Sequence, residues 1–161
     1  RVNTMATKIA LTMYDGEIGQ LRAGDTLDIT ASNNQIFSAT NQNVAAITIG
    51  QPVYIQGANT VDLALADAKA TSGVIGLVLD ASIDSSAVGT ILTDGILTST
   101  DWTAVVGAAT LTVGSVYFLS DVTAGTLTTT APTTTGSFVT RVGTAISTTT
   151  LEVTISRPIG L

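Results

Sequence analysis

The chain has 161 residues, of which 45% are hydrophobic, 11% are charged and 4% are aromatic, and its formal net charge is -6. This length suits one domain with a single sizeable core, and the scattered six basic residues argue against nucleic acid as a partner. The absence of Cys excludes disulfides and thiolate metal sites, and the absence of His removes the commonest general base and transition-metal ligand.

The expected surface is rich in hydroxyl groups and poor in charge. Thr, Ser, Asn, Gly and Ala take the place of the missing charged residues, and Val, Ile and Thr favour extended backbone. The mean hydropathy of +0.47 is high for a small domain, which indicates that other subunits cover part of its surface. No apolar run approaches the length of about 18 residues that a membrane span needs, so no membrane partner is predicted.

Residues 1–24 match nothing else in the chain and are predicted to form an extended N-terminal arm. They contain both methionines and three of the six basic residues. The arm is expected either to pack on its own domain or to reach onto a neighbouring subunit. Its candidate assembly contacts are Lys8, Ile9, Leu11, Met13, Tyr14 and Arg22.

Residues 25–161 are predicted to form a β domain. Residues 26–31 alternate, with Leu27 and Ile29 on one face, and residues 36–40 resemble a second strand. Asn and Gln cluster on both sides of this second strand, where their side chains favour turns.

The rest of the domain repeats one sequence pattern in two related halves, at about residues 44–97 and 108–156. Each half is predicted to contain a strand that opens with Gly and carries a central Val-Tyr pair, a turn, a short strand around a Leu, and a strand with an internal Gly. The alignment needs gaps. The matched residues are Gly50, Tyr54 and Gly76 in the first half, and Gly114, Tyr117 and Gly143 in the second.

Three local features carry further expectations. Residues 67–73 are rich in Ala and suit one helical turn with Asp67 as N-cap. Asp94-Gly95 is a strong turn pair and predicts a hairpin between residues 88–92 and 95–97. Trp102, the only Trp, is predicted to close one end of the core, with an exposed binding anchor as the alternative.

No helix longer than two turns is predicted anywhere. The predicted fold is therefore all-β, a small barrel or sandwich built from an internally duplicated β unit and preceded by the extended N-terminal arm.

The sequence offers no convincing catalytic or metal-binding constellation. Most Asp residues fall in turns, which favours a structural role over paired acid catalysis. The nearest calcium-loop candidate, residues 80–86, lacks the loop's Gly and terminal Glu. We therefore predict that the protein is not an enzyme and has no catalytic residues, cofactor or metal.

Two stretches carry a resemblance to a known family. The sequences GQPVYIQGANTVDLALADAKATSGVIGLVLDAS and GSVYFLSDVTAGTLTTTAPTTTGSFVTRVGTAISTTTLEVTI resemble the repeated β module of tailed-bacteriophage virion proteins. This module occurs in capsid decoration (cement) proteins and head fibres, and also in tail-fibre and collar-fibre chains. The resemblance covers about residues 44–156 and implies a module that often trimerises on the virion exterior, without catalytic residues.

The first hypothesis is a structural virion protein, made in the host cytoplasm, that decorates and stabilises the outer surface of the capsid. Its partners would be the major capsid protein and other copies of itself, in a trimer. The alternatives are a tail-fibre or collar-fibre adaptor module and a carbohydrate-binding β-sandwich, for which exposed aromatic residues are scarce.

Overall fold

A computed structural model describes residues 34–161, which belong to one unit, Ser32–Leu161. The domain is organised around β7 (Val88–Thr98), a strand of 11 residues. Its first part pairs with β1 (Gln35–Asn41), and its last part, from Asp94 onward, pairs with β12 (Thr150–Thr154). The hairpin predicted at Asp94-Gly95 is therefore wrong. Gly95 has a φ of +120° and bends the strand, which continues because partners hold it on both sides of the bend.

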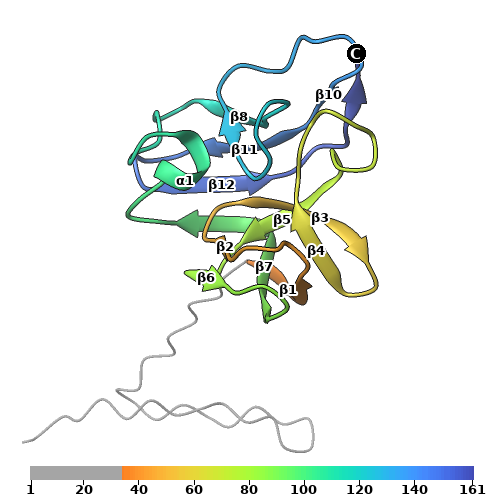
Figure 1. Ribbon diagram of the computed structural model, residues 1–161. Helices are drawn as coiled ribbons and strands as arrows, with labels where there is room; N and C mark the ends of the chain where they lie inside the picture. The colour runs from red at the N-terminus through yellow and green to blue at the C-terminus, as the bar shows by residue number, and fades with distance from the viewer. Residues whose placement is uncertain (1–33) are drawn as a thin grey trace, which may run out of the picture. The chain divides into compact units, whose positions relative to one another are not determined.

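β1 and four strands of the first half close into a small barrel, as the orange to green strands in the lower part of Figure 1 show. The sheet order is β1, β4, β3, β5 and β7, and β7 pairs again with β1. The barrel interior is filled by buried apolar side chains, which include Val53, Val61 and Ile91. The three strands between β1 and β7 are β3 (Pro52–Gly57), β4 (Thr60–Leu63) and β5 (Val74–Val78).

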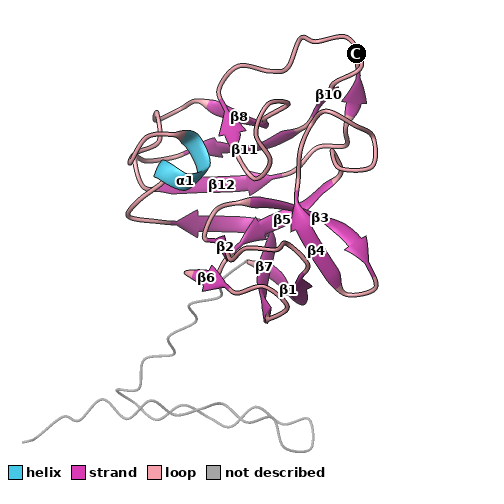
Figure 2. Cartoon of the chain, in the orientation of Figure 1, coloured by secondary structure: helices cyan, strands magenta, loops and turns pink. Residues whose placement is uncertain are grey.

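The second half continues the same sheet beyond β7 in the order β12, β11, β8 and β9 (Figure 1). Two further two-stranded sheets and the short helix α1 (Thr103–Val106) complete the domain, in which nearly all regular structure is strand (Figure 2). The remaining strands are β2 (Ile47–Thr48), β6 (Ser82–Ile83), β8 (Val116–Leu119), β9 (Leu127–Thr128), β10 (Phe138–Val139), β11 (Arg141–Ala145) and β13 (Ile159–Gly160).

The two halves repeat one pattern of strands and hydrogen bonds. The order β4, β3, β5, β7 in the first half corresponds to β9, β8, β11, β12 in the second, with antiparallel neighbours throughout. The N–H of Gly50 donates to the C=O of Val78 at 2.9 Å, and the N–H of Gly114 donates to the C=O of Ala145 at 2.8 Å. Both glycines have positive φ, +84° and +77°. The structure therefore contains the duplicated β unit.

The cross-strand register corrects one detail of the predicted repeat. Gly76 lies opposite Val53 on β3, and Gly143 lies opposite Tyr117 on β8. Val53 and Tyr117 are thus the equivalent inward residues, and both are buried. The predicted match of Tyr54 with Tyr117 is wrong by one residue. It relied on the Val-Tyr pair that both halves contain, whereas inward and outward side chains alternate along a strand, so a shift of one residue changes the face.

A second core joins the two halves. Val74, Leu77 and Leu92 on the outside of the barrel belong to the same buried cluster as Trp102 and Leu151 of the second half. The buried hydroxyl of Thr140 in the second half donates to the C=O of Ser72 in the first half at 3.0 Å. The barrel is therefore not a separate domain, because its outer wall is the inner wall of this second core.

The structure confirms the predicted all-β fold class and specifies a barrel within it. Residues 67–73, predicted to hold one helical turn, form hydrogen-bonded turns without a helix. The Asp67 carboxylate accepts a hydrogen bond from the Thr71 hydroxyl at 3.1 Å, and the N–H of Ser72 donates to the C=O of Ala68 at 3.0 Å. The predicted arm, residues 1–24, and the predicted strand at residues 26–31 lie outside the described residues.

Asn41 at the end of β1 is a fully buried amide, and its loss is expected to destabilise the barrel. Its Nδ2 donates to the C=O of Ala45 at 3.0 Å and of Ile83 at 2.9 Å, and its Oδ1 accepts from the N–H of Asn43 at 2.8 Å. Asn41→Ala leaves three groups without this partner and should lower the free energy of unfolding by about 2 kcal/mol. Urea unfolding of this variant measures the loss. The exposed neighbour Gln42 provides the control, since Gln42→Ala should change stability by less than about 0.5 kcal/mol.

Candidate assembly surface

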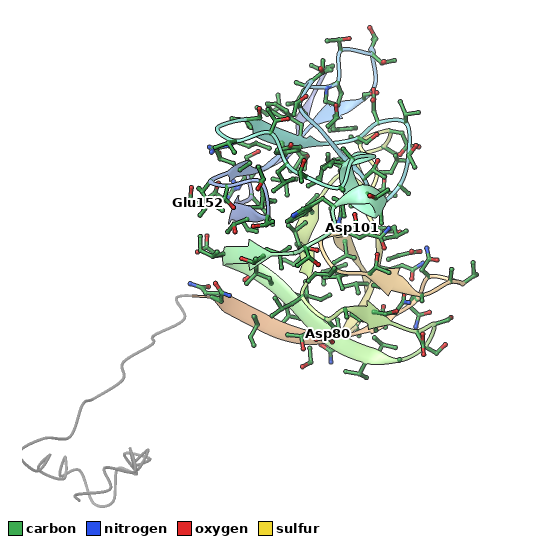
Figure 3. The ribbon with its side chains drawn as sticks, turned by 90° about the vertical axis from the view of Figure 1, so that its left-hand side faces the viewer. Asp80, Asp101 and Glu152 are labelled. Atoms are coloured by element: carbon green, nitrogen blue, oxygen red, sulfur yellow. The ribbon has the colours of Figure 1, made fainter. Side chains whose placement is uncertain are left out.

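Asp62, Asp80 and Asp101 each accept a hydrogen bond from a backbone N–H group. The Asp80 carboxylate accepts the N–H of Thr90 at 2.8 Å. The Asp101 carboxylate accepts both the N–H and the hydroxyl of Thr103, at 2.8 and 2.6 Å, and these hydrogen bonds lower the pKa of Asp101. Figure 3 shows Asp80, Asp101 and Glu152 on separate parts of the domain, none pointing toward another. Their arrangement does not form the facing pair of carboxylates that glycoside cleavage uses.

Tyr54 on β3 is held in its neutral form. Burial raises the pKa of Tyr54, and the negative charge of Asp62, which lies opposite on β4, raises it further. Asp62 itself accepts hydrogen bonds from the Asn43 side chain at 2.8 Å and from the N–H of Leu63 at 2.7 Å. At neutral pH this site therefore contains a protonated phenol beside a hydrogen-bonded carboxylate and supplies no phenolate nucleophile.

Within residues 34–161, no three acidic side chains lie close enough together to hold a metal ion. No helix in that range is long and apolar enough to span a membrane.

Trp102 lies in the second core and has no exposed surface. Its Nε1–H donates to the C=O of Thr149 at 3.1 Å, which satisfies the polar atom of the buried indole ring. The prediction that Trp102 closes the core is confirmed, and the alternative of an exposed anchor is wrong. Trp102 therefore cannot stack on a sugar ring, which removes the main feature that a carbohydrate-binding site on this domain would have used.

Two shallow hollows flank the edge strand β9 and are lined chiefly by threonines and small apolar residues. The first has a volume of about 220 Å³ and the second about 260 Å³, and Thr128 lines both. The first is lined by Val106, Ala108, Thr110, Thr112, Tyr117, Leu127, Thr128 and Thr129. The second is lined by Ser120, Asp121, Val122, Thr128, Thr130, Ala131, Pro132, Thr133 and Thr134.

The chemistry of this surface favours contact with another protein chain over capture of a small molecule. Both hollows are smaller than the roughly 300–1,000 Å³ of ordinary ligand sites. Asp121 is the one charged residue among their linings, and Val122 beside it is 84% exposed. Hydroxyl groups and exposed aliphatic carbon in a shallow surface can be covered by a partner without burying unpaired charge. We refer to β9 and the two hollows as the β9 surface.

The β9 surface was not predicted as a site. The available signal was the run of threonines that follows Leu127, which periodicity analysis treats as a connecting loop. The residues that were predicted as assembly contacts, Lys8, Ile9, Leu11, Met13, Tyr14 and Arg22, all lie outside the described residues.

Comparisons with known proteins do not assign the β9 surface to a family. No protein-family model matches the chain, and no curated protein is significantly similar to it.

Proposed function

We propose that the protein is a structural virion component that decorates and stabilises the exterior of a tailed-phage capsid. It binds across subunits of the major capsid protein, as a homotrimer and without catalysis. The sequence resemblance to the phage β module supports this proposal, together with a duplicated β domain in which Asp62, Asp80 and Asp101 accept hydrogen bonds from the backbone.

The β9 surface is the observation that carries the proposal. It is shallow, rich in hydroxyl groups and nearly free of charge, so its burial requires little desolvation of ions. A decoration protein needs only a modest contact per subunit, because each oligomer engages a repeating lattice at several points. Linked contacts of this kind raise the total affinity far above that of one contact.

Cryo-electron microscopy of the parent virion tests the proposal. The expected result is density that fits the five-stranded barrel on the outer surface of the head, over the joints between major capsid protein subunits. Density for this domain on the tail or collar alone would contradict the proposal and would support the fibre-adaptor alternative.

The predicted arm contacts are tested by binding to capsids stripped of the protein. A variant with Ile9→Ala, Leu11→Ala and Met13→Ala is expected to bind at least tenfold more weakly. The control is Val44→Ala, Ile55→Ala and Val88→Ala, which removes a similar amount of apolar surface from exposed positions on the domain and should leave binding unchanged. Equal loss in both variants would show that the arm is not a specific contact.

A further inference from the structure

The sheet of the second half has one face against the second core and an opposite, outer face that is exposed. Leu97, Leu151 and Ala145 belong to the second core. Because side chains alternate along a strand, the residues next to them in the chain point to the outer face. There Ile96 on β7 is 43% exposed, and Figure 3 shows the exposed Glu152 at the periphery of the domain.

The register places four residues in a row across this outer face. Ile96 lies opposite Glu152 on β12, and Glu152 lies opposite Thr144 on β11. Thr144 in turn lies opposite the half-buried Val116 on β8. Residues that lie directly opposite each other have their side chains on the same face, about 5 Å apart. We refer to Ile96, Glu152, Thr144 and Val116 as the outer row.

A positive charge lies on the outer row beside Thr144. Arg141 is exposed, and its guanidinium Nη2 donates to the Thr144 hydroxyl at 2.8 Å. Within residues 34–161, neither Arg141 nor Glu152 has an ion-pair partner. The outer row therefore has an aliphatic residue at each end, and a carboxylate and a guanidinium on the two sides of its midpoint.

We propose that the outer row binds the outer row of a second copy of the chain, about a two-fold axis that lies in the interface between β11 and β12. This axis reverses the order of the row in the second copy. Glu152 of each copy then meets Arg141 of the other, and Ile96 of each copy meets Val116 of the other. The contact is isologous, because both copies use the same patch.

Charge selects this direction of the axis. A two-fold axis along the row would place Glu152 against Glu152 and Arg141 against Arg141, and like charges in contact are unfavourable. The proposed axis runs along the strands instead, so the strands of the two copies remain nearly aligned, as in ordinary packing of two sheets about 10 Å apart. Glutamate and arginine side chains are long enough to meet across this distance, and the aliphatic residues fill the two ends.

Hydroxyl groups extend the outer face beside the row. Thr98 and Thr150 lie two residues from Ile96 and Glu152 on the same strands, and their hydroxyl oxygens are 3.2 Å apart. A second copy can cover them without burying an unpaired charge. The row itself crosses β7, β12, β11 and β8, a width of about 14 Å at about 4.8 Å per strand. This patch is smaller than the roughly 800 Å² per partner of a standard interface, so the contact by itself is weak.

The inference goes beyond the proposed function and depends on neither a capsid nor a trimer. A monomer that uses the contact becomes a dimer, and a trimer that uses it on one subunit joins a second trimer into a hexamer. In both cases the contact doubles the mass of the particle. On a lattice it would connect neighbouring decoration oligomers, where many weak contacts act together.

Charge reversal in the purified full-length protein tests the inference. Arg141→Glu leaves two acids on the outer row, and Glu152→Arg leaves two bases. Each variant alone should self-associate at least tenfold more weakly than the wild type, because like charges now face each other. An equimolar mixture of the two variants should regain wild-type association, because every acid then meets a base. Sedimentation equilibrium from about 10 µM to about 1 mM protein, a range suited to a weak contact, provides the measurement.

Lys69→Glu and Asp84→Arg are the matched controls, since they make the same changes of charge at exposed positions in the first half. Both should associate like the wild type, alone and mixed. A wild-type mass that does not rise with concentration, as when a different protein or another part of the chain covers the row, would overturn the inference. Wild-type association of either reversed variant, equal loss in the controls, or a mixture no stronger than its components would also overturn it. None of these outcomes bears on the position of the protein on the virion, which the cryo-electron microscopy decides separately.

Discussion

Replacement of Trp102 by alanine is expected to lower the free energy of unfolding by about 3–5 kcal/mol. The indole ring is fully buried in the second core, where it packs with Val105 and against the backbone of Gly50. Its removal creates a cavity where the two halves meet and leaves the C=O of Thr149 without its donor. Guanidinium unfolding followed by circular dichroism measures the loss, because the variant lacks the only Trp as a fluorescence probe.

Trp102→Phe separates the two contributions. Phenylalanine retains most of the apolar volume but not the Nε1–H, so the expected loss is smaller, about 1–2 kcal/mol. A loss below about 1 kcal/mol for Trp102→Ala would contradict the packing described for the second core.

The second large effect is expected at the internal glycines of the two halves, Gly76 and Gly143. A Cβ at Gly76 would lie closer than 3.0 Å to the C=O oxygen of Leu92, and a Cβ at Gly143 would meet the C=O of Glu152 in the same way. Backbone atoms of β7 and β12 cannot move aside as a flexible side chain can. Gly76→Ala and Gly143→Ala should therefore each lower the free energy of unfolding by about 3 kcal/mol.

Gly73→Ala is the matched control for this pair. Gly73 precedes β5, its φ is not in the positive range, and nothing lies within 4 Å of the position of an added Cβ. This variant should change stability by less than about 0.5 kcal/mol. If Gly143→Ala were as well tolerated as Gly73→Ala, the close approach of β11 and β12 would be disproved, and with it the equivalence of Gly76 and Gly143.

These carbonyl oxygens also explain why each half has a Gly at this position. In each half an added Cβ at this Gly would meet a backbone carbonyl of the next strand, and a buried residue adjoins the Gly in the chain, Leu77 after Gly76 and Val142 before Gly143. A strand Gly normally weakens a sheet. Here it is required, because any side chain would separate two strands that enclose the cores.

The local signals in the sequence identified most of the strands correctly. Residues 36–40 lie in β1, and the strands predicted to carry an internal Gly, at Gly76 and Gly143, are β5 and β11. The turn predicted after the Val-Tyr strand of the first half joins β3 to β4, where Asn59 has the positive φ that amide side chains tolerate. These elements depend on neighbours in the chain, which is why alternation and turn residues are sufficient to find them.

The same signals failed where a strand's partners are distant. Asp94-Gly95 has the composition of a hairpin turn, yet pairing with β1 and β12 continues the strand through it. Tyr54 and Tyr117 look equivalent, yet their side chains occupy different faces of the sheet. The sequence does not indicate the β9 surface. A threonine-rich loop becomes a candidate contact surface only through its position beside an edge strand, which the sequence pattern does not show.

The amino-acid sequence by itself determined that this chain forms a β domain with two related halves, because alternation, turn chemistry and the opening glycines are properties of short segments. Only the tertiary structure decided that the first half closes into a barrel while the second ends with β9 at the edge of the sheet. Closure depends on the parallel pairing of β1 with β4 and its antiparallel pairing with β7, contacts between residues about 20 to 60 positions apart. Pairing at such separations is selected by the packing of the whole core and not by any local segment.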